Sequence, residues 1–396
     1  MTDRFYTDVY AMSASKSGEE LCGDKVYVKY SENSSVIVLA DGLGSGVKAN
    51  ILATLTSRIL GTMLSEGASI EDCVETISAT LPVCRERGVA YSTFTMIKVD
   101  NNGDVYTAEF DGPEMVNIRD GVLDESVQKN KRILNGREVW ESRFHAQVGD
   151  MMVVFSDGVI HAGVGQLINL GWKRTNILEF IQRTYHKNMP ARTMTQELLR
   201  TCVHLYQEKP GDDTTVVTVH ILPRAETRVL VGPPADMKDD AKVVEILMSA
   251  SGNRIVCGGS TSQVVARELQ QEIKAETEIY DEKVPPAAHI KGIDLVTEGV
   301  LTLTAAEELL DRYKAECEQG TMPESYTDLE KKDGATRLIR MLLDESSDIV
   351  FMLGQANNPA YNKGDTRLGL DAKMRIITSI SEKLKYFGKN TSIEEY

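Results

Sequence analysis

Acidic residues stand at the ends of several apolar segments in the first part of the chain, and their chemistry suits a metal ion. These residues are Asp24, Asp41, Asp157 and the pair Asp212 and Asp213. The adjoining segments are rich in β-branched residues, which predicts strands. Carboxylates held close together need a positive charge between them, and hard oxygen ligands favour Mg²⁺ or Mn²⁺. The spacing therefore predicts a divalent-metal site at strand ends, although each motif alone is also typical of an ordinary turn.

The segment around Asp41 shows the pattern most fully. The apolar run 36–40 ends on Asp41 and Gly42, and further glycines follow at 44 and 46. Glycines let a backbone come close to whatever Asp41 binds. The spacing of Val47, Ile51, Leu55 and Ile59 then predicts a helix over 47–65 with these residues on one face. Leu52, Met63 and Leu64 lie beside that face.

The remaining elements of this part must position the aspartates. Besides 36–41, strands are expected over 25–30, 90–99, 105–110, 114–118, 140–145, 150–156 and 214–221. Helices are expected at 174–186 and 193–207, and a capping box from Ser69 to Asp72 opens another. The turn 100–103 predicts a hairpin. Early helices, many strands and late helices are typical of a sheet sandwich covered by helices.

Three of these motifs together carry a family resemblance. Asp41–Gly46, Phe155–Gly158 and Gly211–Thr214 resemble, in this order and spacing, the PPM (PP2C-like) metal-dependent serine/threonine phosphatases. The bacterial branch of stage II sporulation protein E is the nearest in pattern, over residues 1–222. The resemblance implies an α-β-β-α sandwich that contains two Mn²⁺ or Mg²⁺ ions. It also implies a phosphorylated regulatory protein as substrate, such as an anti-sigma antagonist.

The same resemblance implies a role for each acidic position. Asp41, Asp157 and Asp212 are the expected catalytic residues, with Asp41 bridging two ions and the Gly42 carbonyl binding one. Asp157 and Asp212 complete the second ion's shell, Asp24 acts directly or through water, and Asp213 supports Asp212 by hydrogen bonds. Two ions that share a water lower its pKa, so that hydroxide can attack the phosphorus atom.

The sequence departs from the eukaryotic pattern at one position and leaves alternatives open. Glu19 stands where those members place a phosphate-binding arginine, and the nearest basic residue is Lys16. Phosphate binding is thus left to the metals. A non-catalytic metal-bound sensor or scaffold and a phosphatase of a small phosphorylated metabolite remain alternatives. His161 could reach the site, although we expect a surface position.

The chain after residue 222 follows another pattern. A short polar linker, 222–227, precedes alternating strands and helices over 228–396, which predicts an α/β domain with a mostly parallel sheet. The whole chain is thus α+β, and this second domain is expected to be regulatory or ligand-binding. A possible ligand loop comprises Gly258, Gly259, Ser260, Thr261 and Glu298. An ordinary helix start capped by Ser260 is the slightly favoured alternative.

Composition limits the partners and the compartment. The chain has 396 residues and a net charge of −15, which argues against a nucleic-acid partner. No apolar run is long enough to span a membrane, and no signal pattern is found at the N-terminus. Six scattered cysteines form neither a zinc motif nor a disulfide framework. We therefore expect a cytoplasmic protein.

Overall fold

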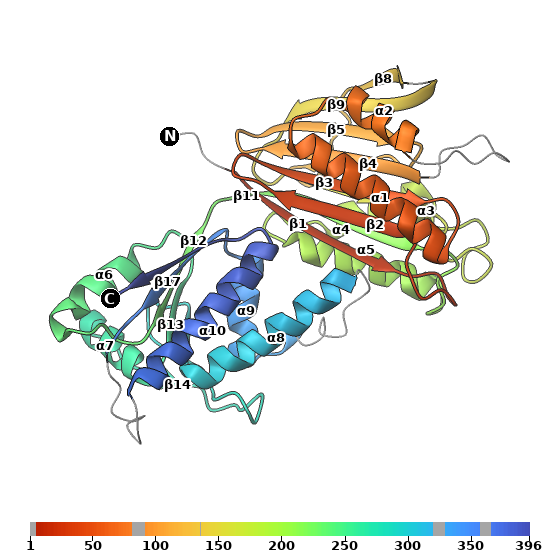
Figure 1. The fold of residues 1–396 in the computed structure, drawn as a ribbon. Helices are drawn as coiled ribbons and strands as arrows, with labels where there is room; N and C mark the ends of the chain where they lie inside the picture. Colours follow the sequence, from red (N-terminus) through yellow and green to blue (C-terminus); the bar gives the residue numbers. More distant parts are fainter. Residues whose placement is uncertain (1–4, 81–91, 135, 320–328, 357–365) are drawn as a thin grey trace. The chain divides into compact units, whose positions relative to one another are not determined.

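The chain folds into two compact units. The structure is a computed structural model that describes residues 5–80, 92–134, 136–319, 329–356 and 366–396. The first unit extends to Pro223, and the second begins at Arg224 (Figure 1). Both combine helices and sheets, so the expected α+β class is confirmed.

The first unit is built around two antiparallel sheets. The six-stranded sheet has the order β2-β3-β4-β5-β9-β8 and the five-stranded sheet the order β1-β11-β10-β6-β7. The strands of the first are β2 (Asp24–Tyr30), β3 (Ser34–Gly42), β4 (Ser92–Asp100), β5 (Asp104–Phe110), β8 (Lys129–Leu134) and β9 (Arg137–His145). Those of the second are β1 (Phe5–Ala14), β6 (Val116–Arg119), β7 (Val122–Leu123), β10 (Met151–Phe155) and β11 (Thr214–Pro223).

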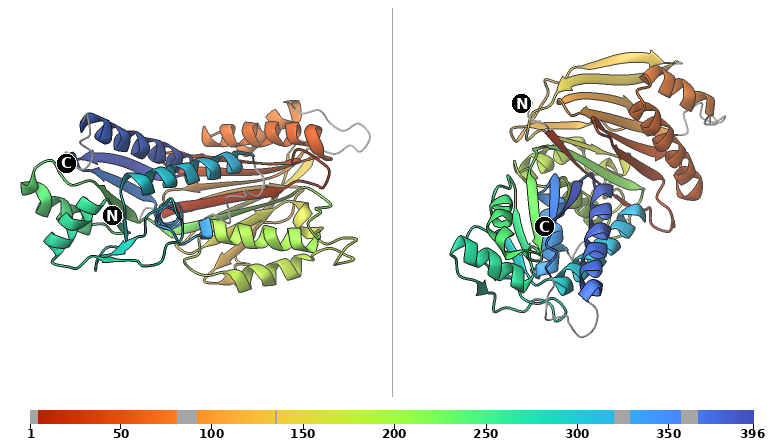
Figure 2. Two further views of the ribbon diagram at one scale, coloured as in Figure 1. Left: turned by 90° about the horizontal axis from the view of Figure 1, so that it is seen from below. Right: turned by 60° about the vertical axis from the view of Figure 1, so that its left-hand side comes forward.

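Helices cover the outer faces of both sheets, which gives the expected α-β-β-α sandwich (Figure 2). On one side lie α1 (Gly46–Ser65) and α2 (Ile70–Thr80), and on the other α4 (Arg174–Thr184) and α5 (Ala191–Leu205). A short helix, α3 (Asp157–Ile160), follows β10. The capping box that begins α2 is confirmed, because Ser69 Oγ donates to Asp72 Oδ2 at 2.7 Å and Asp72 N donates to Ser69 Oγ at 3.2 Å.

Strand β3 has a hydrophobic core on each of its faces, one under α1 and α2 and one between the two sheets. Its side chains alternate between these cores, which fixes the orientation of the Asp41 side chain at its end. Val36, Val38 and Ala40 pack under α1 and α2. Ile37 and Leu39 point the other way, into the core between the two sheets. Because both faces of β3 are buried, its sequence is continuously apolar rather than alternating. The carboxylate of Asp41 is therefore carried at the end of a rigid central strand.

The helix predicted after Asp41 is confirmed as α1, and Leu52 and Leu64 are buried, but most of its predicted apolar face is exposed. Val47, Ile51 and Leu55 are 61%, 53% and 44% exposed, and the face toward the sheet carries mostly small side chains. That face includes Ala49, Ala53, Ser57 and Gly61 together with Leu52, Leu60 and Leu64. A Cβ atom on Gly61 would lie 2.1 Å from the Tyr27 ring. Small residues let α1 lie close against the sheet, so Val47, Ile51 and Leu55 are left outside the buried face.

The second unit contains a seven-stranded, mostly parallel sheet, as expected. Its order is β14-β15-β16-β13-β12-β17-β18. The pairs β12–β13, β13–β16, β12–β17 and β17–β18 are parallel, while β14 and β15 form an antiparallel edge. The strands are β12 (Glu226–Val231), β13 (Arg254–Cys257), β14 (Lys274–Ala275), β15 (Ala288–His289), β16 (Leu295–Thr297), β17 (Asp348–Leu353) and β18 (Asn390–Glu395).

Helices cover both faces of this parallel sheet. On one face α6 (Asp240–Met248), preceded by a 3₁₀ turn at Met237–Asp239, and α7 (Gly259–Leu269) pack against residues of β12, β13, β16 and β17. On the other face lie α8 (Val300–Gln319), α9 (Gly334–Asp344) and α10 (Thr366–Tyr386) (Figure 1). This two-sided cover explains why strands such as β17 are almost wholly apolar.

We expect the chain to yield two separately folding fragments when it is divided between Pro223 and Arg224. Most of the expected linker belongs to strands, since β11 ends at Pro223 and β12 begins at Glu226. Arg224 belongs with the second fragment because its Nη2 lies 2.7 Å from Asp348 Oδ1. Circular dichroism and thermal unfolding of each purified fragment test this. A fragment that remains unfolded or precipitates would show that the two units depend on each other for folding.

Candidate metal centre

Asp24 and Asp41 form a directly opposed pair across two strands. They are register partners at the ends of β2 and β3, so their side chains share one face of the sheet. Asp24 is only 2% exposed. Neither of its carboxylate oxygens has a hydrogen-bond partner among the residues that the structure describes. Two like charges opposite each other, one of them buried and unpartnered, are unfavourable unless a cation joins them.

The pKa values of these carboxyls are raised. Burial is the main cause for Asp41, and repulsion from the other four aspartates adds to it. Burial also raises the pKa of Asp24. The Ser156 and Thr215 hydroxyls lie close enough to oppose that increase, yet neither makes a hydrogen bond of normal geometry with Asp24. Burial and the Asp212 charge raise the pKa of Asp157. Without a counterion, ionisation of these three carboxyls is therefore unfavourable in the folded protein.

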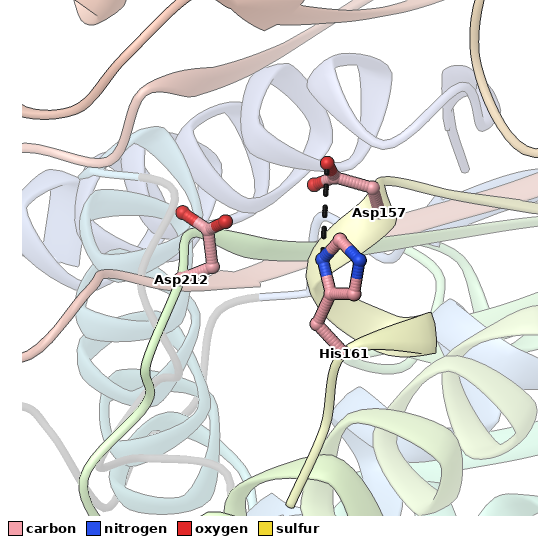
Figure 3. Close-up of side chains that lie close together, drawn as sticks. All are labelled: Asp157, His161 and Asp212. Carbon is pink, nitrogen blue, oxygen red and sulfur yellow. Dashed lines mark ion pairs between the residues drawn. The ribbon is translucent and has the colours of Figure 1, made fainter. Parts of the chain in front are cut away.

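Asp157, His161 and Asp212 form the tightest group of potential ligands in the described part of the chain. Their ligand atoms all lie within 4.8 Å of one another (Figure 3). Asp157 begins α3, directly after β10, while Asp212 precedes β11, the neighbouring strand. His161 Nδ1 lies 3.9 Å from Asp157 Oδ2, and the two side chains are 53% and 49% exposed. His161 is thus on the surface, as expected, and also reaches the site.

Asp213 turns its carboxylate into the protein rather than toward Asp212. Its backbone N–H donates to Asp212 Oδ1 at 3.0 Å, which agrees with a supporting role. Its own Oδ1 accepts the backbone N–H of Lys16 at 3.0 Å, whereas Oδ2 is buried without a partner among the described residues. The side chain is near Asp24, because a Cβ on Gly23 would lie 2.7 Å from Oδ2. Asp213 is therefore a fifth acidic member of the centre.

Lys16 and Glu19 have different surroundings, which the sequence did not indicate. Lys16 Nζ lies 4.0 Å from Asp212 Oδ1. Glu19 instead lies at the start of α1, where its Oε1 accepts Ser45 Oγ at 3.0 Å. A carboxylate at a helix N-terminus is favourable. Glu19 therefore stabilises the N-terminus of α1, whereas Lys16 places a positive charge beside the centre.

The donor set of this centre fits a hard divalent cation. All five carboxylates supply oxygen, and three of their oxygens, on Asp24 and Asp213, are buried without hydrogen-bond partners in the described structure. One lysine at 4.0 Å cannot balance five carboxylates. Oxygen ligands in excess of nearby positive charge are what Mg²⁺ and Mn²⁺ require. The acidic cluster could therefore bind metal.

The possible ligand loop lies in the second unit, and the structure brings its parts together. Cys257 and Thr297 are register partners, so Gly258 and Glu298 follow neighbouring strands at the same level. Ser260 is not the helix cap: α7 begins at Gly259, and the N-cap is Gly258, which has no side chain to offer. Thr261 is fully buried, where its Oγ1 accepts Gly232 N at 3.1 Å and donates to the Cys257 carbonyl at 3.2 Å.

The family comparison agrees with the fold of the first unit. An α-β-β-α sandwich with carboxylates at its strand ends is the arrangement that the PP2C-like resemblance implies. Residues 31–222 match the family model of Stage II sporulation protein E (SpoIIE), so the resemblance is confirmed for this part of the chain. A search of curated proteins found no match.

Several solved structures are similar at low identity. The PP2C phosphatase domain of SpoIIE from Bacillus subtilis, with a fragment of its regulatory domain, is 19% identical with a TM-score of 0.48, covering 56% of this chain and 66% of that one. The RsbU and RsbW domains of a Mycobacterium tuberculosis protein are 14% identical with a TM-score of 0.48, covering 62% and 69%. The SiaA PP2C domain of Pseudomonas aeruginosa is 14% identical with a TM-score of 0.42, covering 53% and 85%. The chain thus spans just under two thirds of the B. subtilis structure.

None of the described helices is both long enough and apolar enough to cross a membrane.

Proposed function

We propose that the first unit is a phosphatase that uses two Mn²⁺ or Mg²⁺ ions to remove phosphate from phosphoserine or phosphothreonine. The observation that carries this proposal is the convergence of five carboxylates from the strand ends of both sheets, with buried oxygens that lack partners among the described residues. The match to the SpoIIE family over residues 31–222 supports the reaction class. When bound, such ions lower the pKa of water and stabilise negative charge on a transferring phosphoryl group.

Asp41 is the residue best placed to serve both ions. It lies opposite Asp24 across β2 and β3, and the charges of the other four aspartates all raise its pKa. Asp24 and the Gly42 carbonyl would hold an ion on the side of β2 and β3. Asp157 and Asp212 would hold one on the side of β10 and β11, with Asp213 behind them. Because the ligands come from both sheets, the packing of the sheets would hold the two groups of ligands at a fixed separation.

Lys16 and His161 would complete the site around the substrate. Lys16 is 39% exposed beside Asp212, so its ammonium can contact a phosphoryl oxygen on that side without a large rearrangement. An ammonium group binds phosphate as a point charge and so partly replaces the arginine of the eukaryotic pattern. His161 Nδ1 lies 3.9 Å from Asp157 Oδ2 and, when protonated, would attract this carboxylate.

The exposure of the site favours a protein substrate over a small metabolite. The side chains of Asp157 and Asp212 are 49% and 37% exposed. Sites for small molecules are concave and enclose most of the ligand. A phosphorylated side chain on another protein can reach an open site of this kind. We therefore propose a phosphorylated regulatory protein in the cytoplasm, such as an anti-sigma antagonist, as the substrate.

One observation favours a second candidate, a metal-bound scaffold without turnover. Glu19 takes the position expected for arginine and is engaged with Ser45 at the start of α1. The Glu19 carboxylate is negatively charged and repels phosphate. Phosphate binding would therefore depend on the ions and Lys16. Such a protein would hold metal and a phosphorylated partner but release the partner intact.

A metal titration separates these functions. The metal-free chain is expected to be inactive on para-nitrophenyl phosphate and on a phosphoserine peptide, and Mn²⁺ or Mg²⁺ should restore turnover of both. Calorimetry on the same samples measures metal binding independently of activity. A chain that binds Mn²⁺ yet hydrolyses neither substrate would support the scaffold. A chain that binds no divalent ion would exclude both functions.

A further inference from the structure

Four parallel strands of the second unit end at the same level. Val231, Cys257, Thr297 and Leu353 are in register across β12, β13, β16 and β17. The residues that follow them form one edge, which we name the carboxyl edge: Gly232, Gly258, Glu298 and Gly354. The strand order changes direction at β12, with β13 and β16 on one side and β17 and β18 on the other. In open α/β sheets, ligands bind outside the carboxyl ends at such a switch point.

Backbone atoms rather than side chains form most of this edge. Gly232 and Gly258 have φ values of +89° and +121°, which favour glycine. A Cβ on Gly354 would lie 2.1 Å from the carbonyl oxygen of Pro233, so no side chain fits there. A Cβ on Gly259, by contrast, would meet no atom within 4 Å. The space in front of the start of α7 is therefore open.

Lys373 of α10 brings a positive charge to the carboxyl edge. A Cβ on Gly232 would lie 3.4 Å from its Nζ. The side chain is partly buried, and it makes no hydrogen bond or ion pair with any residue that the structure describes. Burial lowers the pKa of Lys373, and the charge of Glu298 only partly opposes this decrease. A partly desolvated ammonium that makes no hydrogen bond within the described structure is stabilised when an anion binds to it.

The start of α7 offers donors that complement this charge. Its N-cap, Gly258, has no side chain, so no N-cap side chain accepts a hydrogen bond from the first-turn N–H groups. Thr261 anchors this turn to β12, because its Oγ1 accepts the N–H of Gly232, the residue beside Lys373. Helix N–H groups from one face of the sheet and a lysine from the other thus approach the same edge.

We propose that the carboxyl edge binds a small phosphate monoester that carries hydroxyl groups. The phosphate lies between Lys373 and the first-turn N–H groups of α7. Glu298 accepts a hydroxyl of the same molecule. One of its oxygens, Oε2, already accepts Leu301 N at 3.2 Å, and Oε1 makes no hydrogen bond to a described residue. This site is independent of the proposed phosphatase, since all its residues belong to the second unit.

Calorimetry on the full chain tests this site with inorganic phosphate, ribose 5-phosphate and AMP. EDTA is included so that no cation in the first unit can hold phosphate. Ribose 5-phosphate is expected to bind more tightly than inorganic phosphate because Glu298 contacts its hydroxyls. AMP compared with ribose 5-phosphate shows whether a base adds affinity. Lys373→Met should weaken binding of ribose 5-phosphate at least tenfold. Lys385→Met, on an exposed part of the same helix, should leave binding unchanged.

A second pair of variants tests the site without altering Lys373. Gly259→Asp adds a negative charge at the start of α7, where the space is open and acidic residues favour helix formation. It should abolish binding, whereas Gly259→Ala should retain it. The proposal is overturned if the wild type binds none of the three probes at about 10 mM. It is also overturned if Lys373→Met and Gly259→Asp, both folded by circular dichroism, bind ribose 5-phosphate as the wild type does.

Discussion

Asp41→Asn is expected to reduce metal-dependent turnover of a phosphoserine peptide by at least about a thousandfold. The substitution removes one charge from the carboxylate that interacts with all four others and is proposed to serve both ions. Stopped assays with saturating Mn²⁺ measure the effect. Asp212→Asn should cost less, because this side chain is 37% exposed and is proposed to contact one ion.

The same variant has a second readout that a merely unfolded protein would not give. Folding disfavours ionisation of the Asp41 carboxyl, because burial and the other aspartates raise its pKa. The neutral amide of Asp41→Asn removes this cost, so the metal-free variant should unfold at a higher temperature than the metal-free wild type at neutral pH. The stabilisation by Mn²⁺ should be lost. Asp111→Asn is the matched control, since Asp111 is exposed in the same unit and its φ of 53° suits asparagine. An Asp41→Asn variant with near wild-type turnover would disprove the proposed centre.

Gly42→Ala is expected to destabilise the first unit by about 3 kcal/mol and to remove metal binding. A methyl group here would lie 2.1 Å from the carbonyl oxygen of Ala49 and 2.7 Å from its carbonyl carbon. These are backbone atoms of α1, so either α1 or the end of β3 must move. Urea unfolding followed by circular dichroism measures the loss.

Gly112→Ala is the matched control for this substitution. A Cβ there would come no closer than 3.8 Å to another atom, and the expected change in unfolding free energy is therefore small. If Gly42→Ala unfolded at the same urea concentration as the wild type and bound Mn²⁺ equally well, close packing of α1 would not position Asp41.

The acidic strand ends and the sandwich could be predicted because their signals are local. The continuous apolar runs of β3, β10 and β11 are buried, and each lies next to an acidic motif. A single short segment of sequence contains both the strand and the ligand. The hairpin between β4 and β5 was predictable for the same reason, since its turn residues stand together.

Other features depend on contacts between distant segments. Strand β1 was not predicted because buried polar residues interrupt its pattern: Asp8 Oδ2, for instance, accepts Ala191 N at the start of α5. The inward turn of Asp213 depends on the backbone of Lys16, 197 residues away. Lys373 belongs to a helix that is predictable in itself, but its place beside Gly232 follows only from the assembled sheet. Neither local composition nor spacing contains this information.

The pairing of β1 with β11 has a consequence for synthesis on the ribosome. These two strands join the first and last segments of the first unit in a ladder from Phe5 and Pro223 to Ala14 and Thr214. A nascent chain therefore carries β1 without its partner until β11 emerges, and closing so long a loop is entropically costly and slow. Asp212 and Asp213 directly precede β11. The acidic centre is consequently completed last, when the repulsion it adds can be offset by an already formed core.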